Sequence, residues 1–419
     1  TNGNAPFNLV TSDYTGSGAT LACSNTTKFG NLRLYVGFQN VIGQTTGVTE
    51  FSSFNNGGGA ATVYAYAGTN DGSNHYTAKI PVPADVAGIS QAAGSARVMT
   101  VGQVKEPKLE AKSIADPRPA VSPQVLVSVG VQNTYVDFPL TGTLVPRRVV
   151  VASEKCNVCH GLLGTQSGSN TAPGGNAFHG GARNIVEACV VCHDPNRMSS
   201  TVMTNGLAMN ESFQFKRLIH GIHGNSKRTY PFTAGNKVVG QFDDDGTLLT
   251  QGSFLAAQTV SINNTTTTVI SAGTPVPAGS TFQTIADMIT AAARALGYTG
   301  TAIAPAENYG AEVAYPDATL NCNACHVDNS YQLDRGTLGA VVSKPASVTD
   351  PLKWMVISPK AASCTSCHDS PKAIGHVTSF GNASYGNRTQ AESMQIQEIC
   401  ADCHAGGGFK GVDIVHGLK

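Results

Sequence analysis

Short runs of alternating apolar and polar residues mark the first 150 positions of the chain. The clearest runs combine β-branched and aromatic residues with a period of two, and Gly, Asn and Pro separate them, at residues 32–36, 61–66, 96–101 and 125–131. Each run predicts a short β-strand. Repeated short strands favour an all-β sandwich of the immunoglobulin-like type, which we assign to residues 1–150. The Cys–Trp–Cys signature of antibody-type domains does not accompany them.

Residues 151–419 have weak periodicity, so we expect this second domain to be loop-rich and mostly α-helical or irregular. Residues 281–296 are an exception, because they have a helical pattern that Gly297 is placed to end. They belong to a long segment, about residues 225–320, that we interpret as an insertion that makes partner or subunit contacts. Its acidic triplet at 243–245 lacks the ligand spacing of a calcium loop, which favours a solvated turn over a calcium site.

Ten of the eleven cysteines fall into five copies of Cys-x-x-Cys-His. In this motif the two thiols form thioethers to a haem, and the histidine binds the iron from the proximal side. One copy alone could be a redox dithiol or half of a zinc site, but neither requires a histidine after every cysteine pair. The sequence therefore predicts five c-type haems, held by Cys156, Cys159 and His160, by Cys189, Cys192 and His193, by Cys322, Cys325 and His326, by Cys364, Cys367 and His368, and by Cys400, Cys403 and His404.

Six histidines lie outside the motifs, and five of them fall between residues 156 and 419, one for each predicted iron. A predicted helix over residues 215–224 carries two of them three positions apart, so the two rings can reach neighbouring irons. A separate metal site is the alternative for this pair, although no third ligand of a usual type is near in sequence. His75 is interpreted as a surface residue, or alternatively as a ligand donated to a neighbouring subunit's haem. The expected distal ligands are His179, His220, His223, His376 and His416.

The composition indicates which partners and which cellular location to expect for the chain. There are 27 basic and 27 acidic residues, so neither nucleic acid nor an anionic membrane surface is an expected partner. Only 13% of the residues are charged, which suits an extracellular surface. No apolar run approaches the ~20 residues of a membrane span, and we expect an export signal to have been removed. Cys23 is expected to be a buried thiol or an intermolecular disulfide, with a lipoprotein cleavage box at 20–23 as the weaker alternative.

Several segments resemble the outer-surface OmcA/MtrC decahaem cytochromes. They are ACVVCHDPN at 188–196, FKRLIHGIHG at 215–224 and YPDATLNCNACH at 315–326, and Trp354-Met355 with the following motif continues the likeness. The resemblance covers about residues 150–419. It implies alternating β-barrel or immunoglobulin-like and pentahaem domains, and electron transfer to extracellular minerals, shuttles and other cytochromes. This chain is similar to one half of such a protein.

Two functional hypotheses follow from the ligand count. Because an iron between two imidazoles has no open position, the first is an extracellular electron conduit at the outer-membrane surface, without catalytic residues. Its expected partners are other multihaem cytochromes or copies of itself, and external acceptors that include metals and minerals. A homopolymeric haem filament is one form of this conduit. The alternative is a multihaem reductase of a small oxyanion, which requires one iron without a distal ligand. An adhesive or assembly role for residues 1–150 is compatible with either hypothesis.

Overall fold

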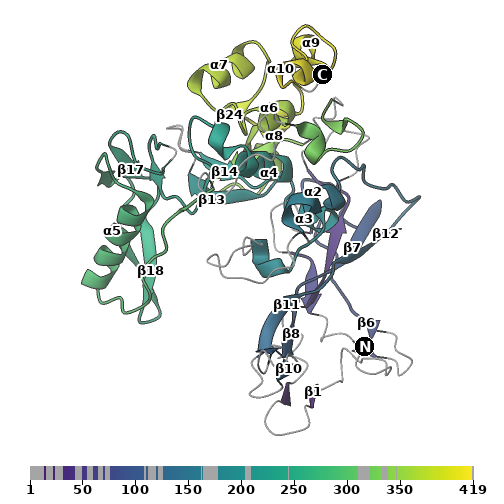
Figure 1. Ribbon diagram of the computed structural model, residues 1–419, viewed down its shortest axis with the longest axis horizontal. Coiled ribbons are helices and arrows are strands. Elements are labelled where there is room, and N and C mark those ends of the chain that lie inside the picture. Colours follow the sequence, from purple (N-terminus) through teal and green to yellow (C-terminus); the bar gives the residue numbers. More distant parts are fainter. Residues whose placement is uncertain are drawn as a thin grey trace. The chain divides into compact units, whose positions relative to one another are not determined.

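The computed structural model describes residues 14–15, 22–23, 32–42, 50–53, 60–64, 69–70, 76–107, 110–111, 119–120, 126–161, 163, 178–202, 209–243, 245–309, 321–332, 338–345 and 347–417. The chain divides into two compact units (Figure 1). The first comprises Thr1–Val41, Thr49–Cys192 and Asn323–Ser330, and the second Ile42–Val48, His193–Cys322 and Tyr331–Lys419. The stretch up to Cys192 thus groups with the preceding strands, and the predicted domain boundary near residue 150 stays a prediction.

An antiparallel four-stranded sheet is the centre of the first unit. Its order is β12-β7-β3-β4, with bounds Arg33–Phe38 for β3, Thr62–Tyr64 for β4, Ser95–Val101 for β7 and Thr134–Pro139 for β12. Phe38, Ala61 and Ala96 form a buried cluster on it. On neighbouring strands Arg97 pairs with Asp137, with 2.7 Å between Arg97 Nε and Asp137 Oδ1. The prediction of short antiparallel strands in this part of the chain is confirmed.

Two-stranded antiparallel ribbons make up the other strands described in this unit. They are β1 (Tyr14–Thr15) with β2 (Ala22–Cys23), β5 (Thr69–Asn70) with β6 (Tyr76–Thr77), β8 (Gln103–Pro107) with β11 (Leu126–Gly130), and β9 (Glu110–Ala111) with β10 (Pro119–Ala120). The finer assignment, an immunoglobulin-like sandwich, stays a prediction. Short helices follow the strands in the chain, at α2 (Ser153–His160), η3 (Phe178–Gly181) and α3 (Val186–Cys192).

The second unit is a mixed α/β region. Its three-stranded antiparallel sheet consists of β22 (Ala340–Ser343), β23 (Met355–Ile357) and β24 (Tyr385–Thr389), and β13 (Met198–Val202) pairs with β14 (Asn210–Ser212). The expectation of mostly helical and irregular structure was therefore too narrow. The helices are α4 (Phe215–His223), η4 (Asn225–Lys227), η7 (Pro351–Lys353), α6 (Pro359–Cys364), α7 (Pro371–Ser379), α8 (Gln390–Ser393), α9 (Ala401–His404) and α10 (Val412–Val415). Two 3-10 turns lie where the chain passes between the units, η5 (Cys322–Ala324) and η6 (Ser330–Gln332).

The segment interpreted as an insertion has a hydrophobic core of its own. Helix α5 (Phe282–Ala295) contributes Ile285 and Ile289 to this core, and Figure 1 shows it beside the hairpin of β18 (Gln258–Ile262) and β19 (Thr265–Ile270). A capping box at Thr281 begins the helix, and Gly297, with φ of 91°, follows its end. The predicted helix is confirmed. The remaining strands here are β15 (Thr233–Ala234), β16 (Val238–Val239), β17 (Gly252–Phe254), β20 (Pro275–Val276) and β21 (Glu307–Asn308).

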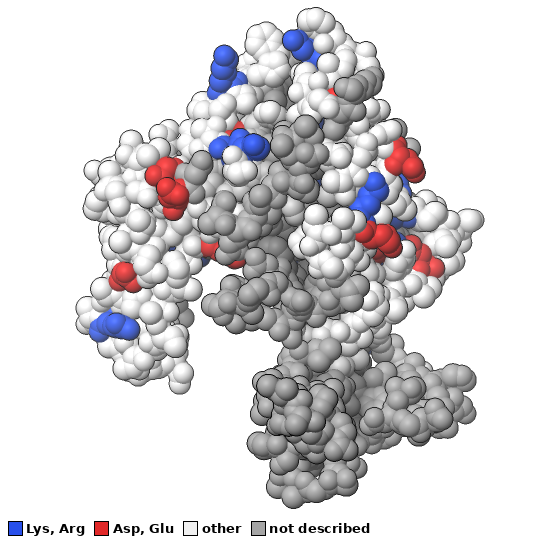
Figure 2. Space-filling model, in the orientation of Figure 1, with Lys and Arg blue, Asp and Glu red and all other residues white. Residues whose placement is uncertain are grey.

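The surface is sparsely charged. On the face shown in Figure 2, acidic and basic side chains stand in small separate groups among uncharged residues. In the acidic turn, Asp243 Oδ1 accepts hydrogen bonds from the backbone N–H groups of Asp245 and Thr247, at 3.1 and 2.8 Å. That carboxylate therefore stabilises its own turn, as expected for a solvated turn. Among the described residues, no helix has the length and apolar character needed to cross a membrane.

Candidate haem sites

All five Cys-x-x-Cys-His motifs lie on a helical turn or at the end of one. On a helix, residues three and four positions apart project from one face, so the two thiols and the imidazole of a motif can face the same side. All ten motif thiols are free of disulfides. Thioether attachment of a haem requires thiols that are available in this way. The elements concerned are α2, α3, η5, α6 and α9.

In the first unit, polar contacts hold the second motif against the β-strands. The buried Asn133 and Asn184 exchange hydrogen bonds, because the backbone N–H of each donates to the side-chain oxygen of the other, at 2.8 and 2.7 Å. The Ser53 N–H donates to the carbonyl of Val191 at 2.9 Å, and Ser53 Oγ lies 3.4 Å from Cys192 Sγ. The strand region therefore fixes the position of a thiol that is predicted to bind a haem.

Within the first unit, the first motif lies beside Cys325 and His326 of the third, although the two motifs are far apart in the sequence. Val151 and His326 form an antiparallel bridge, and Lys155 Nζ donates to the carbonyl of Asn323 at 2.7 Å. Ser330 Oγ lies 3.1 Å from His326 Nδ1. A residue just before motif one is therefore tied to the proximal histidine of motif three.

Burial keeps several motif thiols uncharged. It raises the pKa of Cys156 to about 11 and that of Cys189 to about 12. A redox-active dithiol needs the opposite, a lowered thiol pKa, so this alternative is disfavoured. Burial also lowers the pKa of His326 to about 4. His326 is therefore a neutral imidazole, the form that binds metal ions.

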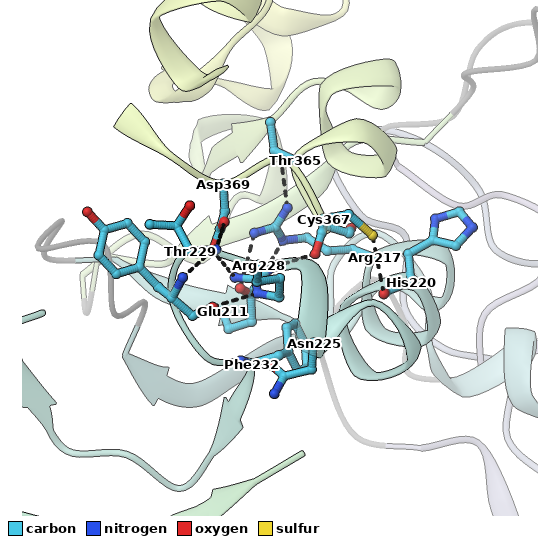
Figure 3. Close-up of polar contacts among 12 residues, drawn as sticks. Glu211, Arg217, His220, Asn225, Arg228, Thr229, Phe232, Thr365, Cys367 and Asp369 are labelled. Atoms are coloured by element: carbon cyan, nitrogen blue, oxygen red, sulfur yellow. Dashed lines mark hydrogen bonds and ion pairs between the residues drawn. The ribbon is translucent and has the colours of Figure 1, made fainter. Parts of the chain in front are cut away.

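In the second unit, the fully buried Arg217 joins α4 to the fourth motif (Figure 3). It forms an ion pair with Glu211, and its Nη1 donates to Thr365 Oγ1 at 3.0 Å. Thr365 lies inside the motif, between Cys364 and Cys367. Burial, the largest single influence, lowers the pKa of Arg217, but its interactions with Glu211 and Tyr385 together raise that pKa above its ordinary value, so the guanidinium stays charged.

A second buried ion pair holds the residue that follows the proximal histidine of the fourth motif. Arg228 Nη2 lies 3.2 Å from Asp369 Oδ2, and Arg228 also donates to the carbonyl of Ser366 (Figure 3). The other carboxylate oxygen of Asp369 accepts the backbone N–H of Thr229 at 2.7 Å. Since Asp369 adjoins His368, these contacts restrict the backbone from which that imidazole projects.

Helix α4 approaches the fourth motif most closely at its C-cap, Gly224. A Cβ added to Gly224 would lie well inside van der Waals distance of Cys367 Sγ. The same sulfur donates to the carbonyl of His220 at 3.7 Å, and Ser363 Oγ lies 3.2 Å from His220 Nδ1. The second thiol of the fourth motif thus contacts the helix that carries two predicted distal ligands.

Hydrogen bonds orient several of the predicted iron ligands. Nδ1 lies 2.8 Å from a backbone carbonyl oxygen in His193, 3.0 Å in His223 and 2.9 Å in His404. A carbonyl can only accept, so Nδ1 carries the proton in these three rings and Nε2 keeps its lone pair. Metal-binding histidines in proteins are commonly held in this way through their second nitrogen.

Two histidine pairs have the spacing of two ligands of one metal ion. The ring centroids of His368 and His416 are 6.1 Å apart, and those of His376 and His404 are 6.2 Å apart. An imidazole nitrogen binds a metal ion at about 2 Å and its ring centre lies about 1 Å farther, so opposed imidazoles on one ion have centroids about 6 Å apart. Nδ1 of His416 is also buried without a hydrogen-bond partner among the described residues. The donor set therefore fits a haem iron in each pair.

The other predicted ligands are described one by one, by the helix on which each lies. His160 ends α2, and His179 lies in η3 with a positive φ of 57°. His220 and His223 both lie on α4, as the sequence predicted. Among the described residues, no group of three or more metal-binding side chains is found. His75 and the thiol of Cys23 lie outside the described residues.

Sequence patterns did not identify the groups that hold the fourth motif. Arg217 and Arg228 are basic residues in a polar stretch, where an exposed position is the usual outcome. The repeated His-Gly of residues 220–224 was the one signal available for Gly224, since a glycine in a short helix is costly unless something approaches its backbone closely. The contact with Cys367 explains it.

Among the solved structures with a partial likeness to this chain are two outer membrane cytochromes. MtrC from Shewanella baltica OS185 matches with 16% identity and a TM-score of 0.40, over 90% of this chain and 45% of that one. The outer membrane decahaem cytochrome OmcA matches with 15% identity and a TM-score of 0.33, over 90% of this chain and 41% of that one. The chain therefore spans less than half the length of either protein. No curated protein sequence matches it significantly.

A family model covers the part of the chain that contains all the motifs. Residues 148–417 match the outer membrane cytochrome MtrC/MtrF-like model, domains II/IV. The match confirms the resemblance drawn from the segments around the second and third motifs. It also makes c-type haems the expected cofactors of the Cys-x-x-Cys-His motifs. The chain belongs to the MtrC/MtrF-like family of outer membrane cytochromes, of which it contains a domain of type II/IV.

Proposed function

We propose that this chain transfers electrons through five c-type haems, one at each Cys-x-x-Cys-His motif, with two histidines at every iron. A c-type haem held between two imidazoles takes up and gives up single electrons and offers no open coordination position. The observation that carries the proposal is the spacing of the two histidine ring pairs, 6.1 and 6.2 Å. Family membership supports a place at the outer membrane surface or outside the cell.

The ring pairs support two ligand sets at the C-terminal end. His368 of the fourth motif pairs with His416, which follows the fifth motif, while His404 of the fifth motif pairs with His376, which precedes it. The fourth set therefore takes its distal histidine from beyond the fifth motif, whereas the fifth set takes its own from between the two motifs, so one pair is nested inside the other. Because only a short stretch of chain separates His368 from His376, the two sites are close to each other, as a path for electrons between them requires.

The other three sites take their ligands from the remaining histidines. His160, His193 and His326 are the proximal ligands, and His179, His220 and His223 supply the distal side. Helix α4 carries two of these distal ligands and touches the thiol of Cys367. This contact holds α4 beside the fourth motif.

Haem stoichiometry and spin state test the proposal. We expect five haems for each chain by pyridine haemochrome assay and mass spectrometry, and low-spin ferric iron at every site, because each iron has two imidazoles. Cyanide and nitrite should then leave the ferric optical spectrum unchanged. One high-spin site that binds nitrite would contradict the proposal and favour the oxyanion reductase instead. Fewer than five haems would contradict the assignment of one haem to every motif.

A substitution at Gly224 tests the contact between α4 and the fourth motif. Gly224→Ala places a methyl group against Cys367 Sγ, so we expect a large fraction of the purified chains to lose one haem and carry four. Gly375→Ala is the control, because Gly375 lies on helix α7 and its added Cβ meets nothing within 4 Å. Intact-mass spectrometry measures both. Five haems in the Gly224 variant at the control's level would show that the contact is unimportant.

The proposal also covers the domain architecture of the chain, its partners and its assembly. We propose an immunoglobulin-like sandwich for residues 1–150, a pentahaem domain from residue 151 with an insertion at about 225–320, and external metals, minerals or other multihaem cytochromes as electron acceptors. Association of the chain with copies of itself into a filament is the polymeric version. The sparse surface charge of Figure 2 is compatible with close docking between like chains, because little like-charge repulsion opposes it.

A further inference from the structure

The imidazole planes of the two histidine pairs are oriented differently. Those of His368 and His416 are nearly parallel, at an interplanar angle of 26°, and those of His376 and His404 are nearly perpendicular, at 83°. The centroid separations differ by only 0.1 Å, from 6.1 to 6.2 Å. The two pairs are therefore alike in spacing and differ in the relative rotation of their rings.

The plane of His404 is set by the loop that follows the fifth motif. His404 Nδ1 lies 2.9 Å from the carbonyl oxygen of Lys410, and the N–H of Lys410 donates to the carbonyl of Cys403 at 3.1 Å. The loop thus closes on the motif and is fixed at the residue that holds the imidazole. Rotation of the His404 ring would break the hydrogen bond to Lys410.

The plane of His376 is set by an aromatic neighbour. Phe380 lies one helical turn after His376 and stacks on it, with ring centroids 5.7 Å apart and an interplanar angle of 28°. The N–H of Phe380 donates to the carbonyl of His376 at 2.9 Å, which fixes the spacing of the two residues. Phe380 is 74% exposed, so it contributes little to the buried core. Its ring contact with His376 is the interaction that its large side chain makes here.

We infer that Phe380 is a positioning residue that holds the His376 imidazole across the plane of His404, so that the fifth site has crossed axial ligands and the fourth has parallel ones. The inference rests on the proposed function, because it requires an iron in each pair. Second-layer contacts of this kind are one way in which a protein adjusts a haem without changing its ligands. The fourth and fifth sites would then differ in electronic structure although both are bis-histidine.

Ligand-field symmetry makes the two arrangements distinguishable. Two iron d orbitals can interact with the imidazole π systems. Parallel imidazole planes interact with the same one of these two orbitals and separate the two in energy. Crossed planes interact with both orbitals alike, so their energies stay nearly equal. In the electron paramagnetic resonance spectrum of low-spin ferric iron, the parallel case gives a rhombic signal with resolved g values. The crossed case gives a single, strongly low-field feature.

The test compares two substitutions at Phe380 with a control in the fully loaded, fully oxidised chain. Phe380→Leu removes the stacking ring, and we expect the low-field feature to lose the intensity of one haem while a rhombic signal gains it. Phe380→Tyr keeps the ring and should keep the wild-type spectrum. Phe409→Leu is the matched control, because Phe409 is 87% exposed in the same region and contacts Lys410 rather than an imidazole.

The outcomes separate the inference from the proposed function. A wild-type chain with five low-spin haems but no low-field feature would overturn the crossed pair. A Phe380→Leu spectrum equal to that of the wild type, or a Phe409→Leu spectrum that changes equally, would overturn the role of Phe380. High-spin iron, or missing haems, in the wild-type chain would instead contradict the proposed function itself. A wild-type spectrum in Phe380→Tyr, together with loss of the low-field feature in Phe380→Leu, supports the inference.

Discussion

Replacing His416 by glycine is expected to convert one haem in five from low-spin to high-spin ferric iron. His416 lies opposite His368 at 6.1 Å between ring centroids, and its Nδ1 is buried without a hydrogen-bond partner in the part of the chain that the structure describes. Without its imidazole, one iron has an open position, so about a fifth of the haem should also bind cyanide or carbon monoxide. Optical and magnetic resonance spectra of the purified chain measure both changes.

Added imidazole should reverse the effect in the His416→Gly variant, because the glycine leaves room for a free ring at the vacated position. Val415→Gly is the matched control: Val415 is an exposed neighbour on the same helix, so it reports the effect of a glycine on the local backbone alone. We expect that variant to keep every haem low-spin. If His416→Gly also kept all its haems low-spin, His416 would not be an iron ligand.

The haem motifs could be predicted from the sequence because covalent attachment fixes their spacing. Two thioethers and one proximal imidazole demand Cys-x-x-Cys-His whatever the surrounding fold. The distal ligands have no such constraint. Their number could be counted, but the proposed pairing of His376 with His404 and of His416 with His368, one pair nested inside the other, depends on how the chain folds after the fourth motif. Sequence separation alone would have paired each histidine with the nearest motif.

The secondary structure was predictable where local signals were strong. Helix α5 has an amphipathic pattern, a capping threonine at 281 and a terminal glycine at 297, and all three agree. Strand β22 gave no comparable signal, because Ala-Val-Val-Ser at 340–343 is a short apolar run that suits a buried strand and a buried helix equally. In the structure this run forms a strand, and Ala340, Val341 and Val342 are buried in the sheet. The C-terminal region was therefore predicted with too few strands.

The buried arginines were beyond sequence reasoning for a different reason. Arg217 is stabilised by Glu211, which precedes it on a separate strand, and by Thr365, which comes from a distant part of the chain. A charged side chain is buried only when such partners are in place. Local pattern contains no information about a partner that folding supplies from far away.

Replacing Arg217 by methionine is expected to destabilise the second unit by about 3–5 kcal/mol, because it leaves the buried Glu211 carboxylate without its counter-charge. The substitution also removes the hydrogen bond from Nη1 to Thr365 Oγ1, at 3.0 Å in the native chain. Denaturant-induced unfolding of the haem-loaded protein, followed by circular dichroism, measures the change. We expect haem attachment at the fourth motif to fall as well, since Thr365 lies between its two cysteines.

The double variant Glu211→Gln/Arg217→Met separates the charge from the contacts. It removes the uncompensated carboxylate, so it should recover most of the stability that the single variant loses. Lys353→Met is the control for losing a surface ion pair: Lys353 Nζ lies 4.0 Å from Asp350 and its side chain is 70% exposed, so we expect a change below about 1 kcal/mol. If the double variant were no more stable than Arg217→Met, the ion pair with Glu211 would not be the source of the effect. The bond to Thr365 would then be what joins α4 to the fourth haem motif.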